Sequence, residues 1–104
     1  MRLSDTMVKA LEDKGFKRWT KGTMDRLYIS AEALGLEVER YKTGNVSSAY
    51  YRNEHISNSR GSAMLYAKTY IDIATGKLYS TNYTLEQDAR QLYDETIAQY
   101  EAEV

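Results

Sequence analysis

The chain has 104 residues, a formal net charge of −1, and neither cysteine nor proline. This length predicts one domain, residues 1–104, and the missing cysteines exclude disulfides and thiolate chemistry. No stretch approaches the ~20 apolar residues of a membrane span, and residues 1–5 lead into an amphipathic segment rather than a signal peptide. We therefore expect a cytoplasmic protein that does not bind membranes.

An amphipathic helix is the first predicted element. Apolar residues recur at helical spacing from Leu3 to Leu11, and Ser4 is a typical N-cap. Gly15 is typical of the position just past a helix C-terminus. The helix is therefore expected between these two capping residues.

Two hairpins are predicted next, because large and charged side chains alternate along four short segments. A single helical turn over 31–34, ended by Gly35, separates them. The strands are expected over 16–20, 24–30, 36–43 and 46–52, with turns at Lys21-Gly22 and Gly44-Asn45, and with Asn53-Glu54 ending the last strand.

A third hairpin between two helices is predicted in the second half. A helix over 57–68 contains Gly61, which lowers helix propensity by roughly 1 kcal/mol against alanine. Strands over 69–73 and 77–81 follow, and residues 84–87 match a capping box that opens a C-terminal helix. The fold class is therefore α+β: an antiparallel sheet of hairpins, of about four to six strands, with N-terminal, central and C-terminal helices packed against it.

Ten tyrosines against one phenylalanine are the most informative feature of the composition. A tyrosine has an apolar ring and a polar hydroxyl, so the alternating segments at 26–29 and 70–72 predict a sheet with one buried face and one face toward solvent or a partner. Interfaces are enriched in tyrosine, tryptophan and arginine. The predicted binding residues are Arg18, Trp19, Lys21, Arg26, Tyr28, Arg40, Tyr50 and Arg52.

The sequence shows no pattern typical of an enzyme. His55 is the single histidine, and without cysteine a zinc site lacks most of its usual ligands, so we expect no metal and no cofactor. Nearby serines do not indicate a triad, because triads are defined by geometry rather than by sequence proximity. Lys21-Gly22-Thr23 lacks the glycine spacing of a phosphate loop. We therefore predict a non-enzymatic protein.

Charge is distributed unevenly along the chain. Residues 1–52 carry ten Lys/Arg and seven Asp/Glu, which gives +3, and residues 53–104 carry four and eight, which gives −4. The most basic stretch is 14–26, and the most acidic is the C-terminal segment from Thr84 onward. Such a surface can steer two different partners, or its two halves can attract each other.

Several segments resemble small uncharacterised proteins encoded by phages and mobile elements of gut Firmicutes. They are Lys17-Arg18-Trp19-Thr20-Lys21-Gly22-Thr23-Met24-Asp25-Arg26-Leu27-Tyr28-Ile29, residues 43–49, residues 56–59 and the hairpin over 70–77, together covering about residues 17–80. The resemblance brings no catalytic residues. It implies a bacterial host cytoplasm and an accessory protein that binds host machinery, including inhibitors of CRISPR defence.

Two functions are compatible with these patterns. The first is a protein-interaction module that modulates or inhibits a host nucleoprotein system, as an anti-CRISPR protein does, with a host protein or nucleoprotein complex as partner. The alternative is direct nucleic-acid binding through the Lys17–Tyr28 hairpin, where cations and aromatic rings mix; the net charge of −1 argues against it. An exposed strand would also allow a homodimer.

Overall fold

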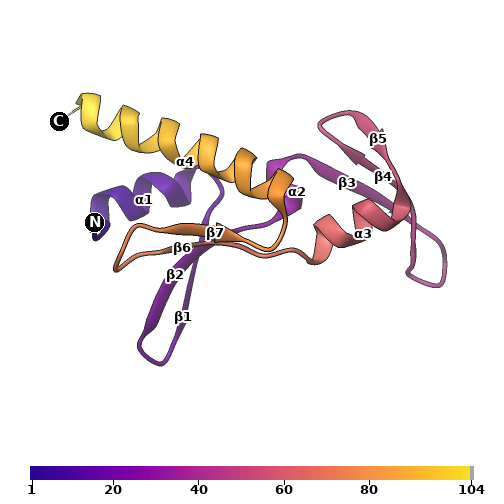
Figure 1. Ribbon diagram of the computed structural model, residues 1–104, viewed down its shortest axis with the longest axis horizontal. Helices are drawn as coiled ribbons and strands as arrows, with labels where there is room; N and C mark the ends of the chain where they lie inside the picture. Colours follow the sequence, from indigo (N-terminus) through magenta and orange to yellow (C-terminus); the bar gives the residue numbers. More distant parts are fainter. Residues whose placement is uncertain (104) are drawn as a thin grey trace.

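The computed structural model describes residues 1–103, which fold into four helices and seven strands (Figure 1). This arrangement confirms the predicted α+β class. The helices are α1 (Asp5–Asp13), α2 (Ala31–Leu34), α3 (Asn58–Tyr66) and α4 (Tyr83–Glu103). The strands are β1 (Lys17–Lys21), β2 (Met24–Ile29), β3 (Leu36–Arg40), β4 (Val46–Tyr51), β5 (Glu54–Ile56), β6 (Thr69–Asp72) and β7 (Leu78–Ser80).

The strands form two antiparallel sheets rather than the single predicted one. The four-stranded sheet has the order β1-β2-β6-β7, and the three-stranded sheet has the order β3-β4-β5. The molecule measures 47 × 32 × 20 Å and has a radius of gyration of 15.1 Å, whereas a compact domain of this length has about 13 Å. The two sheets lie toward opposite ends of this elongated body (Figure 1).

The hairpin of β3 and β4 differs from the prediction at its turn. β3 ends at Arg40, because the chain then closes a wider loop in which the Tyr41 N–H donates to the Asn45 carbonyl at 2.8 Å and the Gly44 N–H donates to the Tyr41 carbonyl at 2.9 Å. A shift of register between Glu39 and Arg40 accompanies this loop. The predicted two-residue turn at Gly44-Asn45 is therefore wrong.

Strand β5 was not predicted from the sequence. Arg52 and Asn53 have φ angles of 51° and 70°, and this left-handed pair makes the tight turn that places Tyr51 opposite Glu54. Non-glycine residues rarely adopt positive φ, and arginine gives no turn signal. Of the two residues expected to end a strand, Asn53 therefore lies in a turn and Glu54 begins another strand.

Two further boundaries are off by one or two residues. The first hairpin turns at Gly22-Thr23, because Lys21 still pairs with Met24 in the ladder. α4 begins at Tyr83, and its cap is Asn82, whose side-chain oxygen accepts the Leu85 N–H at 3.1 Å. The predicted capping box at 84–87 is therefore wrong. By contrast, Ser4 caps α1 as predicted.

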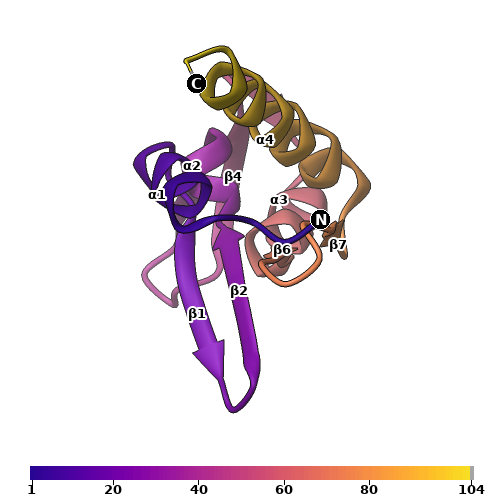
Figure 2. The same cartoon turned by 90° about the vertical axis from the view of Figure 1, so that its left-hand side faces the viewer.

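One face of the four-stranded sheet packs against α1 and α4, which lie on the same side of the strands in Figures 1 and 2. Alternate residues of the strands meet the apolar sides of both helices, and each such buried side chain stabilises the fold by about 1.5–3 kcal/mol. The buried residues from the sheet and the two helices include Leu27, Ile29, Ile71, Leu78, Val8, Leu11, Leu85 and Ala89.

α3 covers one face of the three-stranded sheet, and it comes closest at Gly61. Gly61 is buried, and a Cβ added there would lie 2.3 Å from the Cβ of Ala49 on β4. Non-bonded carbon atoms do not approach each other this closely. The glycine that weakens the helix propensity is therefore required by the packing of helix on sheet.

A polar cluster joins the three-stranded sheet to the rest of the molecule. The Tyr51 hydroxyl at the end of β4 donates to the Asp88 carboxylate on α4. Arg52 lies 3.5 Å from the same carboxylate and donates to the Leu34 carbonyl of α2 at 3.4 Å. Burial, and then the hydrogen bond to Asp88, raise the pKa of Tyr51. We call these residues the Tyr51–Asp88 junction.

Candidate functional site

The face of the four-stranded sheet that points away from the core carries cations and aromatic rings. The register places Tyr28 opposite Lys17 on one side and Tyr70 on the other, and Tyr70 opposite Tyr79. We call this surface the open face, because every one of its side chains keeps exposed area. It consists of Lys17, Trp19, Lys21, Met24, Arg26, Tyr28, Tyr70, Asp72 and Tyr79.

Arg26 lies at the centre of the open face. Its guanidinium carbon is 5.7 Å from the Trp19 ring centroid and 5.5 Å from the centroids of both Tyr70 and Tyr79. The Tyr70 and Tyr79 rings stack with centroids 5.4 Å apart and planes 29° from parallel. Cation–π contacts contribute about 0.5–2 kcal/mol each. The contacts therefore hold one cation and three rings in a fixed arrangement.

A hollow of about 200 Å³ lies beside this cluster. It is lined by Trp19, Tyr28, Lys68 and Tyr70. The Trp19 and Tyr70 centroids are 6.3 Å apart, with ring planes tilted by 50°. Lys68, which precedes β6, is exposed. The open face thus has a shallow recess between aromatic walls with a cation at its edge.

The hydroxyl of Tyr79 is buried under this face and has no hydrogen-bond partner among the described residues. Its burial raises the pKa of Tyr79, and the Arg26 charge opposes that shift. A buried polar group left unpaired costs about 1–3 kcal/mol. Among the described residues, Tyr79 is therefore held in the open face by its ring contacts and not by a hydrogen bond.

The structure brings four of the predicted binding residues together on the open face: Trp19, Lys21, Arg26 and Tyr28. Arg18 lies on the opposite face of β1, where its guanidinium donates to both carboxylate oxygens of Asp25 at 3.0 and 2.6 Å. This ion pair raises the pKa of Arg18 and lowers the pKa of Asp25. Arg18 is therefore part of a hairpin ion pair and not of the open face.

The other three predicted residues belong to the three-stranded sheet. Arg40 donates to the Gly44 carbonyl at 2.7 Å, and Arg52 belongs to the Tyr51–Asp88 junction. The Tyr50 ring meets the His55 ring edge-on at 5.4 Å. The predicted set therefore divides between two surfaces instead of forming one.

The outward face of the three-stranded sheet is acidic where the open face is basic. Glu37 lies opposite Tyr50, which lies opposite His55, and Glu39 lies opposite Ser48. Both glutamates are exposed. These five side chains, which we call the acidic face, have no arginine or lysine among them.

Three residues at the open face were not among the binding residues predicted from the sequence: Lys68, Tyr70 and Tyr79. The alternation in 70–72 and 78–80 does place each tyrosine on the opposite side of its strand from the buried residues. No local pattern says that β6 lies beside β2, however, so residues some fifty positions apart could not be grouped.

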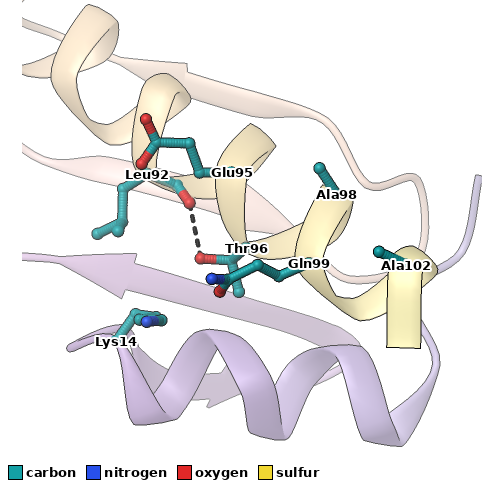
Figure 3. A pocket seen from close by; sticks show the side chains of 7 residues that line it. All are labelled: Lys14, Leu92, Glu95, Thr96, Ala98, Gln99 and Ala102. Carbon is teal, nitrogen blue, oxygen red and sulfur yellow. Dashed lines mark hydrogen bonds between the residues drawn. The ribbon is translucent and has the colours of Figure 1, made fainter. Parts of the chain in front are cut away.

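A larger groove of about 480 Å³ lies between the C-terminal end of α1 and α4 (Figure 3). The Thr96 hydroxyl, drawn with a dashed line in Figure 3, donates to the Leu92 carbonyl of its own helix at 2.7 Å. This hydroxyl is therefore engaged within α4, and we assign no chemistry to the groove. Its lining residues are Lys14, Leu92, Glu95, Thr96, Ala98, Gln99 and Ala102.

Within residues 1–103, no three His, Asp or Glu side chains gather in a way that could hold a metal ion. None of the helices in this range is both long and apolar enough to cross a membrane. Comparisons with protein-family models, curated proteins and solved structures gave no match. The function of the open face is therefore inferred from its geometry.

Proposed function

We propose that this chain is a non-enzymatic binding protein whose open face binds single-stranded nucleic acid. The observation that supports it is the contact of Arg26 with three rings beside the recess of Trp19, Tyr28 and Tyr70. Proteins that bind single strands stack bases on exposed aromatic side chains and follow the phosphates with lysine and arginine.

The local charge also favours a polyanion. Lys17, Lys21, Arg26 and Lys68 lie on or beside the open face, against the carboxylate of Asp72, so four cations minus one acid give +3. Local potential, rather than net charge, steers a charged ligand to a surface. The net charge of −1 therefore does not count against this function.

A protein of a host nucleoprotein complex is the second candidate partner. Tryptophan, tyrosine and arginine are the residues that most often dominate protein-binding hot spots, and the open face clusters all three types. In this case the chain would act as the anti-CRISPR-like module that the phage and mobile-element resemblance implies.

A mobility-shift titration with single-stranded RNA and DNA of about 12 nucleotides tests the proposal. We expect binding at about 50 mM salt that weakens as salt rises, with a slope of about −0.7 per phosphate contact. Arg26→Ala removes the central cation, and we expect about tenfold weaker binding. Arg40→Ala on the three-stranded sheet is the matched control and should bind like the unchanged protein.

The absence of any shift with either nucleic acid at about 50 mM salt contradicts the proposal. The partner would then be sought as a protein retained from nuclease-treated host lysate. Loss of that protein in Arg26→Ala, but not in Arg40→Ala, would favour the second candidate.

A further inference from the structure

We infer that the recess of Trp19, Tyr28 and Tyr70 holds one unstacked nucleobase, with Lys68 at the adjoining phosphate. The inference rests on the proposed function and names a site within the open face. Its volume of about 200 Å³ is below the 300–1,000 Å³ of typical small-molecule sites. The recess therefore suits a single flat group rather than a complete cofactor.

Aromatic walls on more than one side give a base a ring to stack on. The Trp19 and Tyr70 rings are tilted by 50° with their centroids 6.3 Å apart, and both rings line the recess. Tyr70 is held from behind, since it stacks on Tyr79 and contacts Arg26. A wall that is already held in position loses little conformational freedom when a base binds.

The charge of the residues that line the recess favours an anionic ligand such as a nucleic acid strand. The four residues that line the recess include Lys68 and no carboxylate. Asp72, the acid of the open face, lies opposite Arg26 in the register and is not among the lining residues. A base stacked here would bring its phosphate to a lysine without facing a negative side chain.

Trp19 is the single tryptophan of the chain, so its fluorescence reports directly on this recess. The experiment titrates the full chain with a thymidine strand of about 12 nucleotides and with an abasic strand of the same length and charge. We expect the base-bearing strand to quench Trp19 and to bind roughly 5- to 150-fold more tightly, which is 1–3 kcal/mol per stacked base at 1.4 kcal/mol per tenfold.

Variants separate the stacking from the phosphate contact. Tyr70→Ala should lose most of the preference for the base-bearing strand, whereas Tyr41→Ala, on the loop of the three-stranded sheet, should keep it. Lys68→Ala should weaken both strands by a similar factor, because both carry the same phosphates, and Lys42→Ala should weaken neither. Circular dichroism establishes that each variant is folded.

The possible outcomes distinguish the base site in the recess from nucleic-acid binding by the open face as a whole. Equal affinity for both strands with unchanged Trp19 fluorescence overturns the base site while leaving nucleic-acid binding by the open face intact. Binding of neither strand overturns the proposed function and the base site together. A preference that survives in Tyr70→Ala places the stacked base elsewhere and overturns the assignment of the recess.

Discussion

The two sheets are built alike but differ in charge. Each is made of hairpins, with one face packed against helices and the other face outward. The outward side of the four-stranded sheet carries Lys17, Lys21 and Arg26 among its rings, whereas the outward side of the three-stranded sheet carries Glu37 and Glu39. The difference shows that a net charge near zero can result from surfaces of opposite charge on one molecule.

The two charged surfaces do not correspond to the two halves of the sequence. Lys68 comes from the acidic half of the chain but lies beside the open face. Glu37 and Glu39 come from the basic half but form the acidic face. The pairing and packing of the strands, rather than position in the sequence, therefore decide which charged residues share a surface.

The largest expected effect comes from Gly61→Ala, which alters the three-stranded sheet alone. In an exposed helix interior this change stabilises by roughly 1 kcal/mol, but here the new Cβ would meet Ala49 at 2.3 Å. We expect the free energy of unfolding to fall by about 1–3 kcal/mol, as overpacking usually costs. Urea denaturation measures it, and affinity for nucleic acid should stay the same.

Ala49→Gly provides the control for this steric explanation. It removes the Cβ that Gly61→Ala would strike, so the double variant should be less destabilised than the sum of the two single variants. Simple additivity of the two changes would show that the contact between α3 and β4 is not the cause.

The next effect concerns the Tyr51–Asp88 junction, which joins the three-stranded sheet to α4 and α2. Tyr51→Phe removes the hydroxyl that donates to Asp88, and a hydrogen bond to a charged group contributes about 1.5–3 kcal/mol. Because Asp88 keeps Arg52 as a neighbour at 3.5 Å, we expect a loss near the lower limit, about 1.5 kcal/mol. Thermal or urea unfolding at neutral pH measures it.

Tyr51 should also make the free energy of unfolding depend on pH in the alkaline range. Its pKa is raised in the folded chain from the ordinary value of 10.0, so the folded state keeps the proton longer than the unfolded state. The stabilisation is complete below pH 10.0 and is lost as the pH rises above that value. Tyr51→Phe should therefore show a shallower alkaline loss of stability than the unchanged protein, and identical slopes would refute the assignment.

A smaller effect, on the salt dependence of nucleic-acid binding, is expected when charges are removed from the open face but not when they are removed from the acidic face. Lys17→Ala with Lys21→Ala should reduce the magnitude of the salt slope of strand binding by up to about 1.4, twice the 0.7 of one phosphate contact. Glu37→Gln with Glu39→Gln, on the acidic face, should leave the slope unchanged. A larger change in the salt slope from the glutamine pair would show that the nucleic acid binds to the three-stranded sheet and would contradict the proposal.

The smallest expected effect is that of Asp25→Asn, which breaks the ion pair with Arg18. The pair is largely exposed, so we expect less than about 1 kcal/mol. Because Arg18 lowers the pKa of Asp25, this contribution is present at neutral pH and is lost as the pH falls below the ordinary carboxyl value of 3.8. Comparison of melting temperatures at neutral and acidic pH checks the sign.

Local patterns predicted most of the fold. The caps, the alternation and the glycine turns are short-range signals, and they placed three of the four hairpins and all of the longer helices. The capping box at 84–87 and the two-residue turn at Gly44-Asn45 are the exceptions. The missed strand β5 follows a turn in which Arg52 and Asn53 adopt positive φ. Asn53 tolerates this conformation, whereas Arg52 does not favour it and is fixed by long-range contacts, including its N–H donating to the Gly35 carbonyl at 3.1 Å.

The candidate site was predictable only in part, because short-range patterns do not show which distant strands pair. Trp19, Arg26 and Tyr28 are close in sequence and share a hairpin face, so alternation groups them. Tyr70 and Lys68 join them through the pairing of β2 with β6, which depends on long-range packing of the core. Arg18 was misplaced because its neighbouring charges do not reveal which side of β1 is buried.

The alternation of β1 and β2 has a consequence for how this surface can change. In β2, Leu27 and Ile29 point into the core and are buried, while in β1 every residue except the half-buried Trp19 is exposed. Substitutions at exposed positions such as Lys17 and Lys21 should therefore leave the free energy of unfolding nearly unchanged, whereas substitutions of Trp19 or Arg26 remove contacts of the open face. The exposed positions of this hairpin are therefore suited to a randomised library that changes ligand preference while keeping the fold.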